Sequence, residues 1–294
     1  MAQLGPHGPP VKEPLPPLLT LGVHDTLLAA RDGGAATVEC SLDLERSSTT
    51  IALGPTDWGW NGRRYPYLDV CRERTIYYWS AAGFQPAARF THAHFKLVPT
   101  PWGAPTFEID GIKMLPTARV SPYADAQYKV GLIRPRGKRI LDTCAGLGYF
   151  AAWCLRGQAA QLHSYEKSRD VLWLRSLNPW SPDSAWSGES TSAMTLALGD
   201  ITERVLEYPR GCFDAILHDP PRFGIAGELY SQQFYDQLAR VLKGRGRLFH
   251  YTGSPNRLTS GRDVRQEVAT RLRRAGFAAE MQADGVLALK SAPR

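Results

Sequence analysis

Two patterns of apolar and polar residues divide the sequence near residue 120. Before that point, short segments rich in Val, Ile, Thr, Tyr, Trp and Phe are broken by Gly, Pro and Asp, as in ATVECSLDL, STTIALG and RTIYYWSA. Such segments are typical of short β-strands. The pattern predicts a small, mostly β N-terminal domain over residues 19–120, preceded by a proline-rich, extended lead-in over residues 1–18.

From residue 121 onward, short apolar strands alternate with helical segments. Ser121 is a helix N-cap and Pro122 the first helical residue, and the first strand, RILD, follows at residues 139–142. Further strands are predicted at LHSYE, TLALG, CFDAILHD and RLFHY, and the chain closes with a hairpin in AAEMQADGVLALK. Alternation of this kind implies an α/β fold with a Rossmann-like parallel sheet, which we assign to residues 121–294.

The segment LDTCAGLGYF combines a strand end, two glycines and a helix start. Gly146 and Gly148 let the backbone approach a ligand closely, and the helix start offers unpaired N–H groups. With Ala151, this spacing also fits a nicotinamide or flavin cofactor. Asp142 stands just before the turn, where it would repel a pyrophosphate and attract a cationic amino group. A ligand that joins a ribose to an amino acid therefore suits the turn better.

Acidic residues end four successive predicted strands. They are Asp142, Glu166, Asp200 and Asp219. The carboxyl ends of parallel strands meet at one edge of the sheet, which is where ligands bind in open α/β folds. We therefore expect a ligand site at this edge, with Glu166 placed to accept hydrogen bonds from both hydroxyls of a ribose.

The segment HDPPRF follows the fourth of these strands. Two adjacent prolines, Pro220 and Pro221, remove two backbone donors and fix two φ angles, so the chain leaves the strand as a rigid loop. Such a loop can hold a carboxylate and a carbonyl oxygen as acceptors without a competing N–H donor. That arrangement can orient a weakly nucleophilic amine.

The motifs LDTCAGLGYF and HDPPRF, with the order of strand-end acids, resemble class I S-adenosylmethionine-dependent methyltransferases and their seven-stranded sheet. The resemblance covers roughly residues 121–290. Through LNPWS, GELYSQQFY and LFHYTGSPN it narrows to a group of predicted methyltransferases common in archaea. It implies S-adenosyl-L-methionine as the cofactor. The cofactor-binding residues that we assign are Asp142 (amino group), Cys144, Gly146, Gly148 (methionine part), Glu166 (ribose), Lys167, Asp200 (adenine amino group) and Ile201 (adenine face).

In amino-methylating members of this class, an Asp/Asn-Pro-Pro-aromatic tetrapeptide lies beside the reactive methyl group. The resemblance assigns catalysis to residues 219–223, with Asp219 and the Pro220 carbonyl as acceptors for the amine. Arg222 stands where the aromatic residue is expected, and Phe223 is the adjacent candidate for stacking on a base. Tyr251 and Asn256 are expected near the same strand end. The predicted reaction is N-methylation of an exocyclic amine of a base in RNA, with ribosomal RNA and cytidine N4 favoured.

Other functions fit parts of the sequence. DPPR also resembles the RNA 5-methyluridine methyltransferases, but the stretch YTGSPNRLTSGRD lacks the cysteine nucleophile that C5 methylation requires. A small-molecule methyltransferase and an aminopropyltransferase of the polyamine-synthase type share the fold. A non-catalytic RNA-binding protein with a decayed cofactor pocket is the third possibility, and the intact acids and glycines argue against it.

Charge and composition add limited information. The net charge is +7, and residues 121–294 carry the whole excess, with 24 Lys and Arg against 17 Asp and Glu. The basic clusters at residues 134–139, 243–247 and 271–274 favour a polyanionic partner such as RNA, although basic helix ends have the same composition. The sequence does not indicate an oligomeric state.

The remaining features exclude several classes of protein. Five scattered cysteines without a CxxC pair argue against a disulfide framework, and the HxH of His92 and His94 is ordinary strand sequence, so we assign no metal. There is no apolar run of membrane-spanning length and no signal-peptide pattern at the N-terminus. We therefore expect a soluble cytoplasmic protein with no membrane partner.

Overall fold

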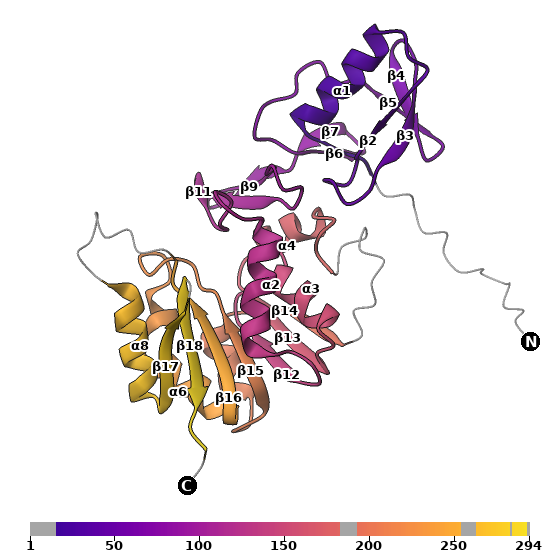
Figure 1. Cartoon of the computed structure of the whole chain (residues 1–294). Helices are drawn as coiled ribbons and strands as arrows, with labels where there is room; N and C mark the ends of the chain where they lie inside the picture. Colours follow the sequence, from indigo (N-terminus) through magenta and orange to yellow (C-terminus); the bar gives the residue numbers. More distant parts are fainter. Residues whose placement is uncertain (1–15, 183–192, 254–262, 283, 293–294) are drawn as a thin grey trace, which may run out of the picture. The chain divides into compact units, whose positions relative to one another are not determined.

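The computed structural model describes residues 16–182, 193–253, 263–282 and 284–292. The predicted lead-in lies almost entirely outside these residues. Contacts between Cα atoms divide the chain into two compact units, residues 1–86 and 87–294 (Figure 1), and each unit is described by itself. No helix in the described parts of the chain has the length and apolar character required to span a membrane.

The described part of the first unit, residues 16–86, contains one helix and two small antiparallel sheets. Helix α1 (Leu21–Asp32) begins at Thr20, whose hydroxyl accepts a hydrogen bond from the Val23 amide. The sequence predicts a mostly β domain here, and this helix is not among the elements named for it. The core between the elements is built around the fully buried Trp58 and Tyr65, whose rings stack at 4.7 Å. The strands are β1 (Leu18–Leu19), β6 (Tyr77–Ser80) and β7 (Gly83–Pro86) in one sheet, and β2 (Thr37–Cys40), β3 (Thr49–Leu53), β4 (Asp57–Trp60) and β5 (Arg63–Pro66) in the other.

The second unit begins with a four-stranded antiparallel sheet. Its strands, in spatial order, are β11 (Ile112–Lys113), β10 (Thr106–Ile109), β9 (His94–Val98) and β8 (Ala88–Phe90). The compact units thus divide the chain at residue 86, earlier than the predicted boundary at residue 120. The boundary lies there because the segment of this sheet forms hydrogen bonds with the α/β part. For example, the Tyr149 hydroxyl donates to the Pro105 carbonyl at 2.6 Å.

The larger part of the second unit is a seven-stranded sheet, which confirms the predicted class I methyltransferase-like fold. The terminal hairpin of β17 and β18 is present as predicted, and β18 is antiparallel to β16. Strand β16 begins at Leu242, five residues earlier than predicted. The spatial order is β14 (Met194–Leu198), β13 (Gln161–Glu166), β12 (Arg139–Asp142), β15 (Phe213–His218), β16 (Leu242–Tyr251), β18 (Gly285–Lys290) and β17 (Phe277–Gln282).

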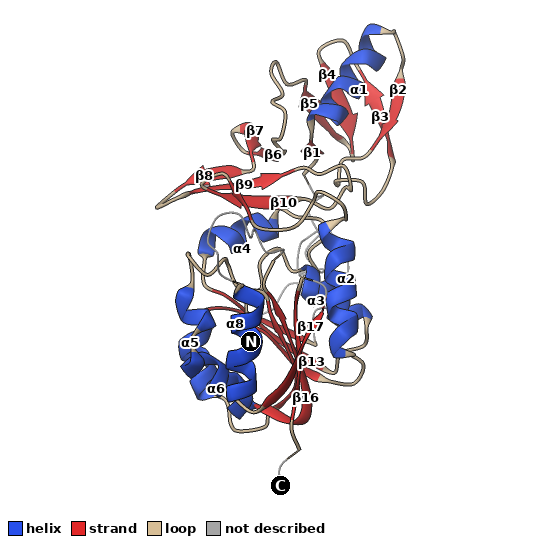
Figure 2. Ribbon diagram, turned by 60° about the vertical axis from the view of Figure 1, so that its left-hand side comes forward, coloured by secondary structure: helices blue, strands red, loops and turns tan. Residues whose placement is uncertain are grey.

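Helices cover both faces of this sheet (Figure 2). Helices α2 and α3 contact each other on one side, and α6 and α8 contact each other on the opposite side. Helix α2 starts as predicted, with Ser121 as N-cap and Pro122 as the first helical residue. The helices of this unit are α2 (Pro122–Ile133), α3 (Tyr149–Arg156), α4 (Arg169–Ser176), α5 (Ile201–Arg204), η1 (Val205–Glu207), η2 (Gly227–Tyr230), α6 (Gln232–Val241) and α8 (Val264–Arg274).

Candidate functional site

The four predicted acids lie together at one edge of the seven-stranded sheet, here called the carboxyl edge. Strands β14, β13, β12 and β15 are neighbours and run parallel, so their carboxyl ends lie side by side. Asp142 ends β12 opposite Leu217 of β15, and Glu166 ends β13 opposite Leu198 of β14. Asp219 follows directly on β15, and Asp200 lies two residues after the end of β14.

Asp142 is fully buried, and one of its carboxylate oxygens is unpartnered. The Ser164 hydroxyl donates to Oδ2 at 2.6 Å, while Oδ1 accepts no hydrogen bond from the residues that the structure describes. Burial raises the pKa of Asp142 to about 6, although the Ser164 hydroxyl and the Arg175 guanidinium oppose the shift. A buried acceptor without a donor is costly, so this oxygen suits a ligand that supplies a hydrogen bond or a positive charge.

Both glycines of the turn after β12 adopt left-handed backbone conformations, with φ of 48° at Gly146 and 82° at Gly148. A side chain at Gly148 would collide with the Arg175 guanidinium, because a Cβ there would lie 2.6 Å from Cζ. Gly148 is therefore required by packing within the protein. A Cβ at Gly146 would meet no atom closer than the Phe107 ring, at 3.9 Å, so only the backbone conformation requires glycine there.

Glu166 holds the glycine turn in place. Its Oε2 accepts from the Gly146 amide at 2.9 Å, and its Oε1 accepts from the Ser168 amide at 2.9 Å. Burial raises the pKa of this carboxyl, and the amide hydrogen bonds oppose the rise. Each carboxylate oxygen has a second lone pair, so Glu166 can still accept from ribose hydroxyls.

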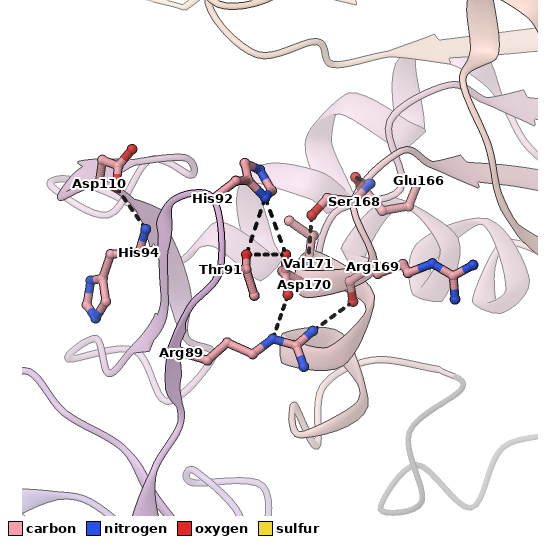
Figure 3. Close-up of polar contacts among 10 residues, drawn as sticks. All are labelled: Arg89, Thr91, His92, His94, Asp110, Glu166, Ser168, Arg169, Asp170 and Val171. Atoms are coloured by element: carbon pink, nitrogen blue, oxygen red, sulfur yellow. Dashed lines mark hydrogen bonds and ion pairs between the residues drawn. The ribbon is translucent and has the colours of Figure 1, made fainter.

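The small sheet β8–β11 attaches just beyond Glu166, at the start of α4 (Figure 3). Arg89 forms an ion pair with Asp170 at 2.6 Å, and the Thr91 hydroxyl donates to the other oxygen of the same carboxylate at 2.9 Å. His92 lies near Asp170, whereas the backbone amide of His94, on β9, donates to the Asp110 side chain at 2.8 Å. The contacts to Asp170 anchor the sheet beside the glycine turn.

Asp200 has two partners within the protein. Its Oδ1 caps α5 by accepting from the Thr202 amide at 2.9 Å, and its Oδ2 lies 2.7 Å from the Lys167 ammonium. Burial raises the pKa of Asp200, but Lys167 and Thr202 outweigh it, so the net shift is downward. Lys167 also lies 3.9 Å from Glu228. Ile201 is buried beside this group as the first residue of α5.

Two buried histidines brace the loops behind the site. His218 bridges the two motifs, because its Nδ1 lies 2.6 Å from the Thr143 hydroxyl and its Nε2 lies 3.1 Å from the Leu229 carbonyl. Burial lowers the pKa of His218 to about 4, so it is neutral and donates through Nε2. His250 pairs with it in register on β16, with the two rings 4.4 Å apart. The histidine of HDPPRF therefore has a structural role.

The proline loop is fixed at one carbonyl and open at the other. Pro220 is buried, and the Tyr230 hydroxyl donates to the Pro221 carbonyl at 3.0 Å. The Pro220 carbonyl accepts no hydrogen bond from any described residue. Arg222 is exposed, and the ring of Phe223 is 37% exposed and meets the Tyr230 ring edge-on at 5.4 Å. The loop thus presents an open acceptor next to exposed side chains.

Asp219 is the least satisfied acid of the carboxyl edge. Its side chain is 17% exposed and accepts no hydrogen bond within the described chain. The nearest charge is the ammonium of Lys129, 3.9 Å from Oδ2. Burial raises the pKa of Asp219 to about 6, Lys129 opposes the shift, and Asp125 and Asp142 add to it.

Lys129 and Asp125 are the site residues that the sequence analysis missed. Both lie on α2, and the Lys129 ammonium contacts Asp125 at 2.6 Å. It also lies 3.5 Å from the centre of the Tyr251 ring, which places Tyr251 at this strand end as expected. The i,i+4 spacing of the two residues is the signal in the sequence that could have pointed to an ion pair. That spacing carries no information on which face of the helix packs against β15.

The remaining predicted residues do not change this picture. Cys144 is half-buried in the turn after β12, and burial raises the pKa of its thiol well above the usual range, with the Glu166 charge adding to the rise. Asn256 lies outside the described residues. All thirteen assigned residues therefore lie in the strand ends, loops and helix starts at or next to the carboxyl edge, and their roles in binding and catalysis remain predictions.

Comparisons with known proteins place this geometry in context. No protein-family model matches the chain. The uncharacterized protein MJ1233 of Methanocaldococcus jannaschii is 39% identical over 222 residues, which are 74% of this chain and 74% of that protein.

Two solved structures share the fold. A spermidine synthase in complex with the transition-state analogue AdoDATO has a TM-score of 0.54 at 15% identity, covering 70% of this chain and 73% of that one. MnmC2 from Aquifex aeolicus has a TM-score of 0.50 at 19% identity, covering 68% of this chain and 71% of that one. At these identities the likeness shows the class I methyltransferase-like fold alone. By its sequence, the chain belongs to the same family as MJ1233 of Methanocaldococcus jannaschii.

Proposed function

We propose that this chain is an S-adenosylmethionine-dependent N-methyltransferase that acts on an exocyclic amine of a base in RNA. One observation carries the proposal. The Asp219 carboxylate and the Pro220 carbonyl are adjacent acceptors without donors among the described residues, next to the strand that ends at Asp142. A planar amine has two N–H groups and so matches two acceptors.

The residues of the carboxyl edge fit the proposed cofactor. The buried and unpartnered Oδ1 of Asp142 would accept from its ammonium group. Glu166 would hold the ribose, and Ile201 would pack on the adenine. Asp200 would accept from the adenine amino group through a lone pair that Lys167 and Thr202 leave free. When bound, the cofactor supplies a methyl group made electrophilic by its sulfonium.

The contribution of the protein to the reaction is to position the acceptor amine. An aromatic amine is a poor nucleophile because its lone pair is delocalised into the ring. Hydrogen bonds from its two N–H groups to Asp219 and to the Pro220 carbonyl favour tetrahedral character at nitrogen and so localise the lone pair. Tyr230 fixes the loop through the Pro221 carbonyl, which keeps the acceptors in place.

Exposed groups of the same loop support a nucleic-acid substrate. Phe223 is exposed and would stack on a base, and the exposed Arg222 guanidinium would stack or meet a phosphate. Ribosomal RNA and cytidine N4 are the favoured substrate and atom. The support for this substrate and this atom is the DPP motif and the basic composition of residues 121–294.

A polyamine-type acceptor is disfavoured by one feature of the site. Such substrates are cationic, and the Lys129 ammonium already lies 3.9 Å from Asp219. An alkylammonium bound to Asp219 would meet this like charge, whereas a neutral planar amine would not.

The test is to incubate the purified protein with S-adenosylmethionine labelled on its methyl group and with either total RNA or a small-molecule extract. We expect label in RNA, and loss of that label with Asp219→Ala. Label in a metabolite and none in RNA would contradict the RNA substrate. Calorimetry that detects no cofactor binding would contradict the enzymatic function itself.

A further inference from the structure

We infer that Lys129 is a positioning residue of the carboxyl edge, which keeps the Asp219 carboxylate ionised and directed toward the acceptor amine. The role of the carboxylate as amine acceptor rests on the proposed function. The contact between the two residues does not.

The position of the Lys129 ammonium is restricted on several sides. The Lys129 side chain is only 3% exposed, although it is charged and lies on a helix that covers the outside of the sheet. Asp125, one turn earlier on α2, holds the ammonium at 2.6 Å, and the face of the Tyr251 ring covers it at 3.5 Å. The Phe150 ring lies 5.7 Å away. A lysine rarely has so little exposure unless its charge is paired.

The Lys129 ammonium thus contacts three groups that come from different elements. Helix α2 contributes Asp125, β16 contributes Tyr251, and β15 leads into Asp219. Two acids and one aromatic face are a complete set of partners for a buried cation. Asp125 alone would satisfy an ion pair on the helix surface, so the burial of the pair against β15 calls for a further explanation.

The electrostatic surroundings of Asp219 supply that explanation. The ionisable groups that face it are Lys129 and Asp125 from α2, Asp142 from β12, Cys144 from the following turn, Tyr230 from η2 and Tyr251 from β16. Within the described chain, Lys129 is the cation that acts on Asp219, and Arg222 of the same loop acts on Tyr251. Burial and two neighbouring carboxyls all favour the protonated form of Asp219, which could no longer accept two hydrogen bonds freely. Lys129 opposes all of these effects, and the pKa of Asp219 is about 6 with it present.

The test is a titration of Asp219 that needs no substrate. In protein labelled with ¹³C at the aspartate side-chain carboxyls, the Asp219 signal is identified by its loss in Asp219→Asn. We expect Lys129→Met to raise the pKa of Asp219 by about one unit or more, because an opposite charge at this distance shifts a carboxyl by about 1–3 units. Lys129→Arg should restore most of the wild-type value.

Matched variants separate charge from packing. Lys113→Met removes an exposed lysine of β11, whose ammonium contacts Thr117, and should leave the titration of Asp219 unchanged. If Lys129→Met does not fold, Asp125→Asn carries the test. It should lower the pKa of Asp219, because it removes a negative charge and leaves Lys129 with Asp219 as its carboxylate partner. An unchanged Asp219 titration in Lys129→Met, or in Asp125→Asn where that variant carries the test, would overturn the inference.

A measurement of methyl transfer tests the same inference independently of the carboxyl titration. Where methyl transfer is detected, the acid limb of its pH profile, expected near pH 6 in the wild type, should move to higher pH in Lys129→Met while cofactor affinity stays within about threefold. If no variant and no wild-type protein transfers a methyl group, the proposed function fails, and the carboxyl titration still decides whether Lys129 keeps Asp219 ionised.

Discussion

At the amino edge of the seven-stranded sheet, where β12, β15 and β16 begin, several charged side chains find partners within the protein. Lys138 donates to the Ile133 carbonyl at the end of α2, and Lys290 donates to the Ala239 carbonyl near the end of α6. Asp214, at the start of β15, accepts from the Lys243 ammonium at 2.7 Å. The carboxyl edge is different, since both Asp219 and one oxygen of Asp142 lack a hydrogen-bond donor among the described residues.

The difference shows that unmatched acceptors locate a functional site better than charge does. Carbonyls at helix ends carry partial negative charge, so cations placed there stabilise the fold. Much of the positive excess of residues 121–294 has this use, including Arg240 at the Val205 carbonyl and Arg247 at the Leu132 carbonyl. At the carboxyl edge Glu166 and Asp200 have partners, but Asp219 and one oxygen of Asp142 have no hydrogen-bond donor among the described residues, and there the protein retains capacity to bind a ligand.

The largest expected effect comes from comparing Asp214 and Asp219, the two aspartates at opposite ends of β15. Asp219→Asn should lower methyl transfer by about 10²- to 10³-fold with little change in cofactor affinity, because it removes an acceptor that positions the amine. Asp214→Asn is the matched control and should change transfer less than about twofold. Equal losses in both variants, measured with labelled cofactor and RNA, would remove the distinction between the edges.

The second effect concerns the cofactor. Asp142→Asn should weaken binding by about 10- to 100-fold, since a hydrogen bond to a charged group contributes about 1.5–3 kcal/mol. Calorimetric titration with S-adenosylhomocysteine measures this without turnover. In the wild type, affinity should also fall as the pH drops through about 6, where Asp142 gains its proton. Unchanged affinity in Asp142→Asn would contradict the prediction that the unpartnered Asp142 oxygen binds the cofactor.

The third effect concerns the free energy of unfolding, which should change in opposite directions in Asp219→Asn and Asp214→Asn. The folded-state pKa of Asp219 is raised, so its charge lowers the stability of the ligand-free protein at neutral pH. Asp219→Asn should therefore stabilise the protein at pH 7 by about 1–2 kcal/mol, and the gain should disappear near pH 4.

Asp214 should show the opposite sign. Burial raises its pKa, but the Lys243 ammonium and the Arg139 amide outweigh burial and lower it overall. Its stabilising contribution is present above the unfolded pKa and is lost as the pH falls. Asp214→Asn should cost about 0.5–1 kcal/mol at pH 7. Urea denaturation of both variants measures the two signs, and a shared sign would contradict the comparison.

The smallest expected effect concerns the exposed cations of the amino edge. Arg136 and Arg245 make no ion pair in the described structure, so they are free to meet a phosphate backbone. Changing both to Ala should weaken RNA binding several-fold and reduce the dependence of log affinity on log salt by about one per side chain. An unchanged salt dependence would mean that RNA does not lie on this edge.

The sequence by itself determined the alternation of strands and helices and the common edge of the four acids. Ser121 and Pro122 start α2, Gly148 starts α3, and parallel strands place successive carboxyl ends side by side. These features depend on local preferences and on one topological rule, so they can be predicted from neighbouring residues.

Only the tertiary structure decided which side chains meet. Lys129 contacts Asp219 across 90 positions, Arg175 requires a glycine at position 148, and Thr143 joins His218. The small sheet of β8–β11 likewise belongs to the second unit because of contacts such as that between Arg89 and Asp170. Hydrogen bonds and ion pairs act over a few ångströms in space, so a pattern along the chain cannot reveal which distant residues will share them.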